Sequence, residues 1–357
     1  MKPLLLFDPS FRATKVVFTD EDLARMHAAA NVVWARDVPA PDDEVERIRS
    51  DVEIIVTGSW RHGDVARFPR LRAIMEVGGG FPSPDDLDYA TCFSRGIRVL
   101  SCAPAFGPAV AELALGLALA ASRQIAWTDR RFRSGDEHWS HTEFGTAIGE
   151  PFTHYGKRVG FIGFGGLARA LKPLLDPLGC DIRVYDPWLT DTFLRRHGVE
   201  PMGIDELLET SRYIYVLAVP SAANRAFLDR PALSRIRPDA VLLLMSRAHV
   251  VDFAALTELV LAGRFRAGID VYPQEPLAAD HPIRGAEHAV LSSHRAGANA
   301  EALHAVGSLV ADDVEAIASG LVPFAMQQAQ PEFIRLRGEP SGGAASRPDV
   351  GAERPGR

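Results

Sequence analysis

One stretch of the sequence, residues 157–186, constrains the fold of this chain more than any other. It reads KRVGFIGFGGLARALKPLLDPLGCDIRVYD. An apolar run of strand length, residues 159–162, leads through a glycine-rich turn into leucines at helical spacing, and a second strand-like run, residues 182–185, ends on Asp186. Strand, glycine turn, helix, strand and acid in this order are typical of a βαβ unit that binds a dinucleotide. The alternative is a glycine-rich turn in a sheet that binds nothing.

The residues of this turn suit a dinucleotide on physical grounds. Gly163 permits the tight turn out of the strand, and Gly165 allows a pyrophosphate to approach the backbone. The pyrophosphate would lie on the free N–H groups at the helix N-terminus, where the helix dipole favours an anion. Asp186 is placed to accept hydrogen bonds from the ribose hydroxyls of adenosine. Because an acid at this position repels a 2′-phosphate, the sequence predicts NAD rather than NADP as the cofactor.

The length and composition of the chain indicate a two-domain cytoplasmic protein. A chain of 357 residues has room for about two domains of ordinary size. The net charge of −7 argues against nucleic acid as a partner. The three cysteines lie far apart in the sequence, which predicts neither a disulfide framework nor a metal site and fits a reducing cytosol. Residues 109–121 are apolar, but Glu112 interrupts them and they are too short to span a membrane.

Strand-like runs alternate with helical patterns along most of the chain. The predicted strands outside residues 157–186 are residues 4–7, 52–56, 73–77, 98–100, 214–219, 241–245, 267–271 and 289–292. The predicted helices include residues 20–30 with Thr19 as the cap, residues 253–262, and residues 301–319 with Gly320 as the stop. This alternation indicates parallel sheets covered by helices on both faces.

Two predicted strands run into loops that are candidates for substrate contact. They are residues 57–60, TGSW, and the glycine run of residues 78–80. In open α/β sheets, ligands bind beyond the carboxyl ends of the strands, where both loops are expected. Residues 78–80 are equally consistent with a turn that only needs positive φ, and the sequence leaves these two interpretations open.

A long apolar helix and an aromatic segment follow the first predicted sheet. The helix, residues 108–125, is apolar on nearly every side, and we expect it to be buried between other elements. The segment after it contains Trp127, Phe132, Trp139 and Phe144. A contact between subunits would hide these aromatic side chains, so we predict a homodimer. From Pro331 onward glycine and proline are frequent, which predicts a disordered tail over residues 331–357.

Three further segments carry reactive side chains near the ends of the later strands. They read LLLMSRAHVVD (residues 242–252), AGIDVYPQEPL (residues 267–277) and LSSHRAGA (residues 291–298). Together with the glycine turn, these segments resemble the D-isomer-specific 2-hydroxyacid dehydrogenases. The resemblance covers about residues 50–322 and includes VAELALGLALA before the dinucleotide unit. Four motifs in a consistent order and spacing are far more specific than any one of them.

The resemblance implies that Arg247, Glu275 and His294 are the catalytic residues, and their chemistry suits these roles. Arg247 offers a planar fork of donors that can grip a 2-oxo acid through its carboxylate and carbonyl oxygens. His294 can give a proton to the carbonyl oxygen as hydride arrives, and can take it back in the reverse direction. Glu275 would hydrogen-bond the other ring nitrogen and favour the charged imidazole. Taken singly, such an arginine is more often a surface salt-bridge partner, and such a histidine is more often solvated.

The resemblance also implies the residues that contact the ligands. The cofactor residues are Gly163, Gly165, Gly166, Leu167, Asp186, Val219, Pro220, Ser246, Asp270 and Gly297. In the family, backbone amides near Gly78 and Gly79 bind the substrate carboxylate together with Arg247, and no metal is expected. The sequence departs from the family pattern at Ala218, Met245, Ala248, Ser293 and Arg295, and in a longer loop after Gly80. The loop puts the identity of the substrate in doubt.

These implications lead to a definite expectation for fold and function. We expect a Rossmann domain that binds NAD (residues 104–297) inserted into a flavodoxin-like substrate domain (residues 1–103 and 298–330), both doubly wound parallel-sheet α/β domains. The expected reaction interconverts a 2-oxo acid and a D-2-hydroxy acid, with glyoxylate or hydroxypyruvate as a guess. The alternatives are a catalytically weak NAD-sensing or scaffold protein of the same fold, and a dehydrogenase of another small anion such as formate or phosphite.

Overall fold

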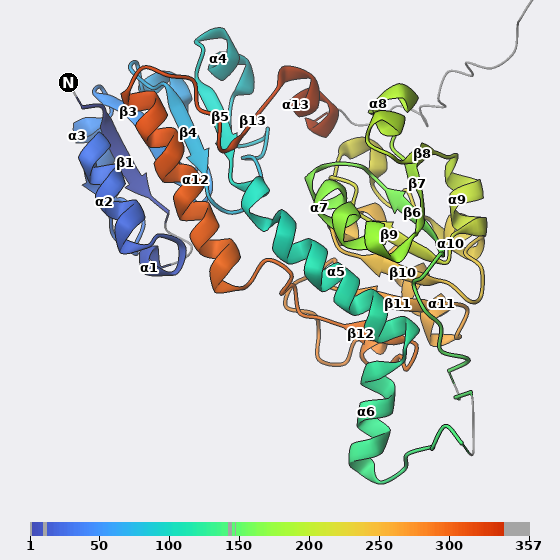
Figure 1. The fold of residues 1–357 in the computed structure, drawn as a ribbon. Coiled ribbons are helices and arrows are strands. Elements are labelled where there is room, and N and C mark those ends of the chain that lie inside the picture. Colours follow the sequence, from blue (N-terminus) through green and yellow to red (C-terminus); the bar gives the residue numbers. More distant parts are fainter. Residues whose placement is uncertain (1, 10–12, 142–144, 147, 339–357) are drawn as a thin grey trace, which may run out of the picture. The chain divides into compact units, whose positions relative to one another are not determined.

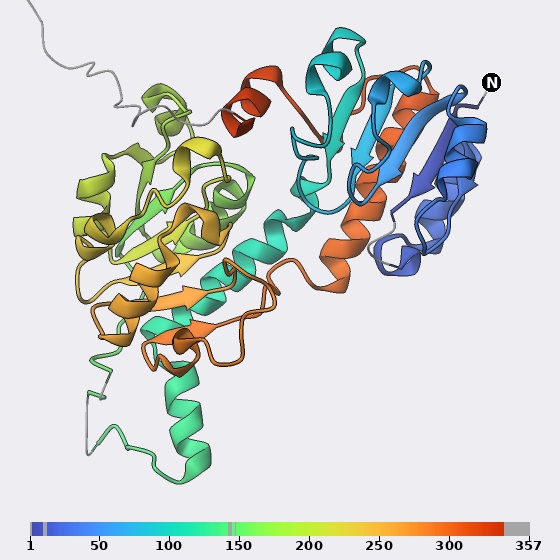
Figure 2. The ribbon, with the colours of Figure 1, turned by 180° about the vertical axis from the view of Figure 1, so that it is seen from behind.

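A computed structural model describes residues 2–9, 13–141, 145–146 and 148–338 of the chain. The chain forms two compact units, each with its own sheet (Figures 1 and 2). The first unit contains the residues up to Gly116 together with Gly166–Leu174 and Ser292–Arg335. The second contains Leu117–Gly165 and Leu175–Leu291. Each sheet consists mainly of parallel strands with helices between them in the chain, which confirms the predicted α/β fold class.

The sheet of the first unit has six strands in the order β13-β5-β4-β3-β1-β2. The strands are β1 (Leu4–Asp8), β2 (Asn31–Trp34), β3 (Val52–Thr57), β4 (Ala73–Glu76), β5 (Arg98–Ser101) and β13 (Gln327–Gln328). Strands β1 to β5 pair in parallel, and β13 pairs with β5 antiparallel. The order β2-β1-β3-β4-β5 is that of flavodoxin-like doubly wound sheets. The parallel strands place Asp8, Thr57, Glu76 and Ser101 together at one edge of the sheet.

The helices of the first unit include α1 (Thr14–Val17), α2 (Asp20–Ala29), α3 (Asp42–Ile48), α4 (Tyr89–Ser94) and α12 (Ala300–Ala318). Two of them, α2 and α12, begin and end close to the predicted residues. Thr19 caps α2 as predicted, because its hydroxyl accepts the N–H of Asp22 at 3.1 Å. Helix α12 ends just before Gly320, which has the positive φ of +77° expected of a stop residue.

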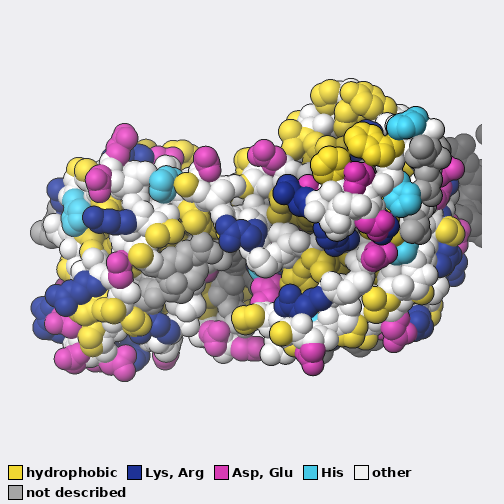
Figure 3. All heavy atoms as spheres, turned by 90° about the horizontal axis from the view of Figure 1, so that it is seen from below, with side chains coloured by type: hydrophobic (Ala, Val, Ile, Leu, Met, Phe, Trp, Pro, Cys, Tyr) yellow, Lys and Arg dark blue, Asp and Glu magenta, His cyan; other side chains and the backbone are white. Residues whose placement is uncertain are grey.

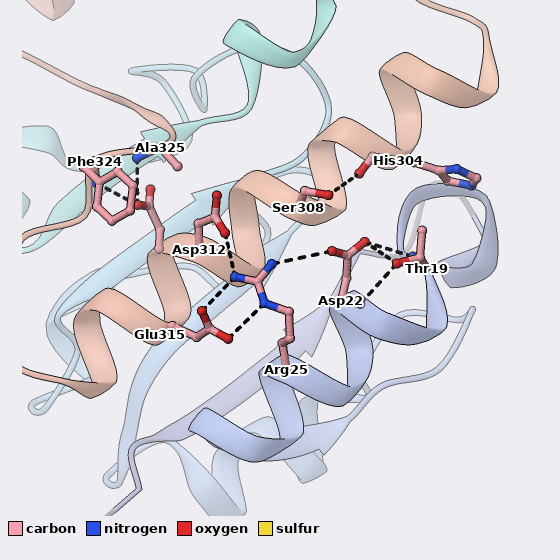
Figure 4. Close-up of polar contacts among 10 residues, drawn as sticks. Thr19, Asp22, Arg25, His304, Ser308, Asp312, Glu315, Phe324 and Ala325 are labelled. Atoms are coloured by element: carbon pink, nitrogen blue, oxygen red, sulfur yellow. Dashed lines mark hydrogen bonds and ion pairs between the residues drawn. The ribbon is translucent and has the colours of Figure 1, made fainter.

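Helices α2 and α12 lie side by side and are joined by an ion cluster around Arg25 (Figure 4). The Arg25 guanidinium donates to Glu315 Oε2 at 2.7 Å and to Asp312 Oδ1 at 2.6 Å. These hydrogen bonds raise the pKa of Arg25, and the bond from Arg25 lowers the pKa of Glu315. The cluster therefore fixes the returning C-terminal helix to the N-terminal part of the same unit.

The sheet of the second unit has seven strands in the order β12-β11-β10-β9-β6-β7-β8. They are β6 (Arg158–Ile162), β7 (Asp181–Tyr185), β8 (Glu200–Pro201), β9 (Tyr213–Val216), β10 (Val241–Leu244), β11 (Arg266–Ile269) and β12 (Ala289–Leu291). The helices between them are α7 (Gly166–Leu175), α8 (Asp191–Arg196), α9 (Ile204–Thr210), α10 (Arg230–Ser234) and α11 (Phe253–Leu261). All neighbouring strands pair in parallel. Numbered from β6, this is the Rossmann order 3-2-1-4-5-6 with one strand added at the edge.

The two central strands of this sheet explain why its core is continuous. Strands β9 and β10, with the sequences YIYV and VLLL, are buried at every position. Strands covered by helices on both faces are apolar throughout instead of alternating, and these two follow that rule. The functional loops of the second unit therefore follow the strands of a buried sheet.

The long apolar helix is shorter than predicted and a second helix follows it. Helix α5 (Gly107–Ser122) ends because Gln124 adopts a left-handed conformation, with φ +59°, and α6 (Ile125–Ser134) begins after it. Half of Ala103–Ser122 is buried, which is less than the predicted burial on nearly every side. This stretch is long and apolar enough to cross a membrane, a property that it shares with core helices of soluble proteins.

The prediction of a disordered tail is wrong for its first residues. Helix α13 (Pro331–Gly338) forms there, with Ile334 only 6% exposed. The Phe333 ring packs against Phe81 with centroids 5.9 Å apart. Burial of these apolar side chains stabilises the helix, and most of the glycines and prolines of the tail follow it. Residues 339–357, and Phe144 of the aromatic segment, lie outside the described residues.

Candidate active site

The glycine turn after β6 leaves room for a cofactor where the sequence predicts it. Gly163 has a φ of +92°, and a side chain there would come within 2.7 Å of Ala218 Cα, so only glycine fits. At Gly165 and Gly166, by contrast, no atom of the described residues lies within 4 Å of the position that a Cβ would take. Helix α7 begins at Gly166 and directs its free N–H groups toward this turn. The open space at a helix N-terminus fits a pyrophosphate.

Asp186 lies against the same turn. Its Oδ2 accepts the Phe164 N–H at 2.8 Å, and its Oδ1 accepts the Trp188 N–H at 2.9 Å. These bonds fix the carboxylate beside the glycine turn at the end of β7. Each carboxylate oxygen can accept a further hydrogen bond, so the two backbone contacts leave capacity for ribose hydroxyls.

Four more of the predicted cofactor residues follow the next strands at the same edge of the sheet, whereas Gly297 belongs to the first unit. Val219 and Pro220 follow β9, Ser246 follows β10, and Asp270 follows β11. Asp270 is fully buried. Ser246 is 6% exposed, and its Oγ has no hydrogen-bond partner among the described residues. A buried hydroxyl without a partner is costly, and a cofactor hydrogen bond would satisfy it.

Two of the predicted catalytic residues lie at this edge of the second unit. Arg247 follows β10, is exposed, and donates from Nη1 to its neighbour's carbonyl, Ser246 O, at 2.8 Å. Glu275 lies in the loop after β11, where its Oε1 accepts the Tyr272 N–H at 3.0 Å. Burial raises the pKa of Tyr272 to about 12, so this phenol stays protonated at neutral pH. Arg247 and Glu275 therefore both lie in loops that follow strands of the same sheet.

His294 belongs to the first unit by its contacts and follows β12 along the chain. Its side chain is exposed, and its backbone has a φ of +53°. A non-glycine residue in this left-handed region is uncommon and costs conformational energy. Such conformations cluster at functional sites, which makes this histidine a candidate on structural grounds as well.

The glycine run after β4 meets the segment of His294 through one aromatic ring. Gly79 has a φ of +100°, so the interpretation as a turn that needs positive φ holds for this residue. A Cβ on Gly79 would lie 3.2 Å from Phe106 Cε2, and a Cβ on Gly297 would lie 2.7 Å from Phe106 Cδ1. The two glycines therefore pack against opposite edges of the Phe106 ring. The sequence gives no signal for Phe106, because its role follows from contacts between distant segments.

A second feature of this loop also has no sequence signal. The Glu76 carboxylate, at the end of β4, accepts the Gly78 N–H at 2.7 Å and the Gly80 N–H at 3.0 Å. The amide of Gly78, a predicted substrate contact, is thus engaged within the chain.

The other candidate loop, residues 57–60, buries its tryptophan side chain. Trp60 is 5% exposed, and its indole N–H donates to Gly63 O at 2.9 Å. Beside it Asp8 is fully buried and pairs with Arg61. Burial lowers the pKa of His62 to about 4, so this histidine is neutral near pH 7. The aromatic and charged groups of this loop therefore contribute to the packing of the first unit.

Comparison with known proteins agrees with this architecture. Residues 115–296 match the family described as D-isomer specific 2-hydroxyacid dehydrogenase, NAD binding domain. The chain belongs to the D-isomer-specific 2-hydroxyacid dehydrogenase family. Its second unit accordingly contains the NAD-binding domain of that family, and NAD is its cofactor.

Several relatives of this dehydrogenase family are similar over most of the chain. A D-3-phosphoglycerate dehydrogenase from Mycobacterium leprae is 31% identical over 265 residues, which are 73% of this chain and 48% of that protein. A glyoxylate reductase from Pyrococcus furiosus is 27% identical over 85% of this chain and 90% of its own. The crystal structure of a phosphoglycerate oxidoreductase from Rhizobium etli is 33% identical, with a TM-score of 0.77 over 92% of this chain and 99% of its own. The chain spans about half the length of the phosphoglycerate dehydrogenases that it matches.

Proposed function

We propose that this protein is an NAD-dependent oxidoreductase that interconverts a 2-oxo acid and a D-2-hydroxy acid. The observation that carries the proposal is the intact trio of Arg247, Glu275 and His294 in a chain of this family. The open glycine turn with Asp186 beside it supports the cofactor half of the proposal.

Each member of the trio has one task in this reaction. Arg247 binds and orients the substrate through its carboxylate and carbonyl oxygens. His294 gives a proton to the carbonyl oxygen during reduction and accepts it from the hydroxyl during oxidation. Glu275 is a positioning residue that would hold the imidazole through its second ring nitrogen. When bound, the nicotinamide supplies or accepts the hydride.

The residues proposed to hold NAD are those at the edge of the second sheet and the glycine turn. Asp186 would bind the ribose hydroxyls, and the amides of Gly165, Gly166 and Leu167 would receive the pyrophosphate. Val219, Pro220, Ser246, Asp270 and Gly297 complete the proposed set. The unsatisfied Ser246 hydroxyl favours a contact with the cofactor at this point.

The proposed substrates are a smaller class than all the acids on which the family acts, but they include more than one compound. The relatives named above are called phosphoglycerate dehydrogenases and glyoxylate reductases. We therefore propose a small 2-oxo acid, with glyoxylate and hydroxypyruvate as the first to test in the reduction direction, and D-3-phosphoglycerate as the alternative 2-hydroxy acid to test in the oxidation direction. Gly78, Gly79 and Arg247 are the proposed contacts of its carboxylate.

A catalytically weak NAD-sensing protein is the second candidate. It is favoured by the substitutions beside the trio, Met245, Ala248 and Ser293. Turnover separates the two: we expect NADH oxidation with at least one member of a panel of 2-oxo acids, and NAD reduction with the matching D-2-hydroxy acid. NADH binding without turnover on the panel, or with formate or phosphite oxidation instead, would contradict the main proposal.

The assembly and location of the protein are part of the same proposal. We propose a cytoplasmic homodimer whose subunits meet through the region of residues 105–150, with an NAD-binding domain of residues 104–297 and a substrate domain formed by residues 1–103 and 298–330. Hydrophobic side chains gather on the face of the molecule in Figure 3. Three large exposed hydrophobic side chains, Ile125, Phe132 and Trp139, belong to α6 and the segment after it, with exposed fractions of 54%, 62% and 57%. Such side chains are typical of a protein interface.

A further inference from the structure

The glycine loop after β4 is built around a carboxylate of the chain itself. Glu76, the last residue of β4, is only 6% exposed. Its Oε1 accepts the Gly78 N–H at 2.7 Å, and its Oε2 accepts the Gly80 N–H at 3.0 Å. The Glu76 carboxylate thus accepts one N–H on each oxygen. A substrate carboxylate bound to a pair of backbone amides would accept hydrogen bonds in the same way.

The fit between the loop and this side chain is close. A Cβ on Gly78 would overlap Glu76 Oε1 and would lie 2.9 Å from the carbonyl oxygen of Gly58. Glycine at position 78 is therefore what allows the Glu76 carboxylate to reach the loop amides. Gly79, between the two bonded glycines, faces Phe106 instead.

The contact has a direct consequence for binding. A backbone N–H makes one strong hydrogen bond, so Gly78 and Gly80 can donate to a substrate only by giving up Glu76. A second carboxylate brought to the same loop would also be repelled by the charge of Glu76, because both negative groups would lie at the same two amides. Hydrogen bonds to charged groups are the strong ones, so the competition is substantial.

We propose that Glu76 is a specificity-determining residue that acts as an internal competitor for the substrate carboxylate at the glycine loop. It weakens the binding of compact 2-oxo acids, which depend on this contact, and selects for substrates anchored mainly through Arg247 and other groups. This inference rests on the proposed dehydrogenase function, because it assumes that the loop faces the substrate carboxylate.

The test uses three variants of the full-length protein with NADH bound. Glu76→Ala frees both amides, and Glu76→Gln removes the charge and frees one amide. Glu53→Gln is the matched control, because Glu53 lies near the start of β3 at the opposite end of the same sheet and pairs with Arg70 and Arg72. The measurements are KM and kcat for the best 2-oxo acid, the Kd of oxamate by calorimetry, and the melting temperature of each variant.

We expect Glu76→Ala to lower KM and the oxamate Kd by about tenfold or more, which is the effect of one charge-assisted hydrogen bond regained. Glu76→Gln should give an intermediate decrease, and Glu53→Gln should change neither constant. A carboxylate that merely orders the loop would give the opposite sign, because its removal would loosen the loop and raise both constants. An increase, or no change, in KM and Kd in both Glu76 variants would overturn the proposal.

The two readouts separate this inference from the proposed function. If oxamate binds more tightly to Glu76→Ala but no variant turns over a 2-oxo acid, Glu76 competes with carboxylates at the loop, but the dehydrogenase proposal and the role of Glu76 in substrate specificity both fail. If the wild type turns over a 2-oxo acid but both Glu76 variants bind oxamate more weakly, the dehydrogenase proposal holds and the role of Glu76 is refuted.

Discussion

At the scale of single residues, Asp186 illustrates how one carboxylate can serve both the fold and the ligand. It accepts the N–H groups of Phe164 and Trp188, and this fixes it beside the glycine turn. The negative charge held there would face the 2′-phosphate of NADP. Preference for NAD would then follow from charge repulsion together with hydrogen bonds to the ribose hydroxyls.

This account predicts the effect of removing the charge of Asp186. The wild type should have a higher kcat/KM with NAD than with NADP, and Asp186→Ser should narrow the ratio by on the order of tenfold. Asp186→Asn is the control for shape, because it keeps the size of the side chain and one acceptor oxygen. It should narrow the ratio as well. A wild-type preference for NADPH would exclude the ribose contact.

Residue-level roles could be predicted only where a pattern in the sequence carries them. The spacing from Gly163 to Asp186 is such a pattern, and the structure places both residues at one turn. The carboxylate of Glu76 leaves no comparable trace, because an acid before a glycine run is compatible with many conformations. The role of Phe106 could not be predicted from the sequence either, because it depends on contacts of the ring with Gly79 and Gly297 from distant parts of the chain.

At the scale of elements, the turn between β6 and α7 separates the needs of the backbone from those of the ligand. Gly163 is required by the close approach to Ala218, whereas Gly165 adjoins open space. Gly163 and Gly165, only two positions apart, are therefore glycine for different physical reasons. Substitution of each by alanine distinguishes these reasons.

We predict that Gly163→Ala reduces stability, whereas Gly165→Ala reduces cofactor binding. Gly163→Ala should lower the melting temperature, because a β-carbon meets the backbone of Ala218 and the positive φ is lost. Gly165→Ala should leave the melting temperature of the apo protein nearly unchanged and should weaken NAD binding, because its methyl group occupies the space proposed for the pyrophosphate. Thermal unfolding and NAD titration of both variants measure these effects. Unchanged NAD affinity in Gly165→Ala would mean that the cofactor binds elsewhere.

The contact between α2 and α12 gives a prediction for stability. Arg25→Ala removes the hydrogen bonds to Glu315 and Asp312 and should lower the free energy of unfolding by about 1 kcal/mol, because the partly exposed pairs are screened by solvent. Arg47→Ala removes a single exposed pair with Glu44 and should cost less. Urea unfolding of both variants at pH 7 tests the difference. Equal effects would show that the cluster contributes no more to stability than a single exposed ion pair.

The same contact has a defined pH dependence. The bond from Arg25 lowers the pKa of Glu315, so its contribution is complete above the pKa of the unfolded state and is lost as the pH falls through the lower folded value. The difference in stability between the wild type and Arg25→Ala should therefore shrink in acid. A difference that stays constant from pH 7 to pH 2 would argue against this ion pair as its source.

Element boundaries were predictable where capping or stop residues mark them, as at Thr19 and Gly320. The break between α5 and α6 at Gln124 was not, because glutamine is an ordinary helix residue and only its left-handed backbone ends the helix. The short edge strands β8 and β13 each have two residues, too few for any periodic pattern to indicate them.

At the scale of the whole molecule, the alternation of strands and helices predicted both doubly wound sheets, because the apolar runs of buried parallel strands are distinctive. The sequence indicates the oligomeric state less clearly than the fold. The prediction of a homodimer rests on the exposed Phe132 and Trp139 rings, which contact each other edge to face with centroids 6.3 Å apart. Aromatic pairs exposed to this extent favour burial against a second subunit.

We predict a homodimer with about twice the chain mass of 38.8 kDa by light scattering at micromolar concentration. The double variant Phe132→Asp with Trp139→Asp should dissociate it, because two charges would have to be buried at the interface. Phe324→Asp is the control, since Phe324 is 74% exposed but lies in the segment before β13. A monomeric wild type, or dissociation by the control alone, would contradict the proposed interface.

The central claim is that this chain reduces a 2-oxo acid with NADH through His294 as the proton donor. The most direct measurement follows NADH oxidation and the configuration of the product for wild type and His294→Ala over the panel of 2-oxo acids. We predict that the wild type forms the D-2-hydroxy acid from at least one of them. His294→Ala should be slower by on the order of 10²–10⁴-fold while its affinity for NADH is retained. Near wild-type rates in His294→Ala, or an L-product, would contradict the account.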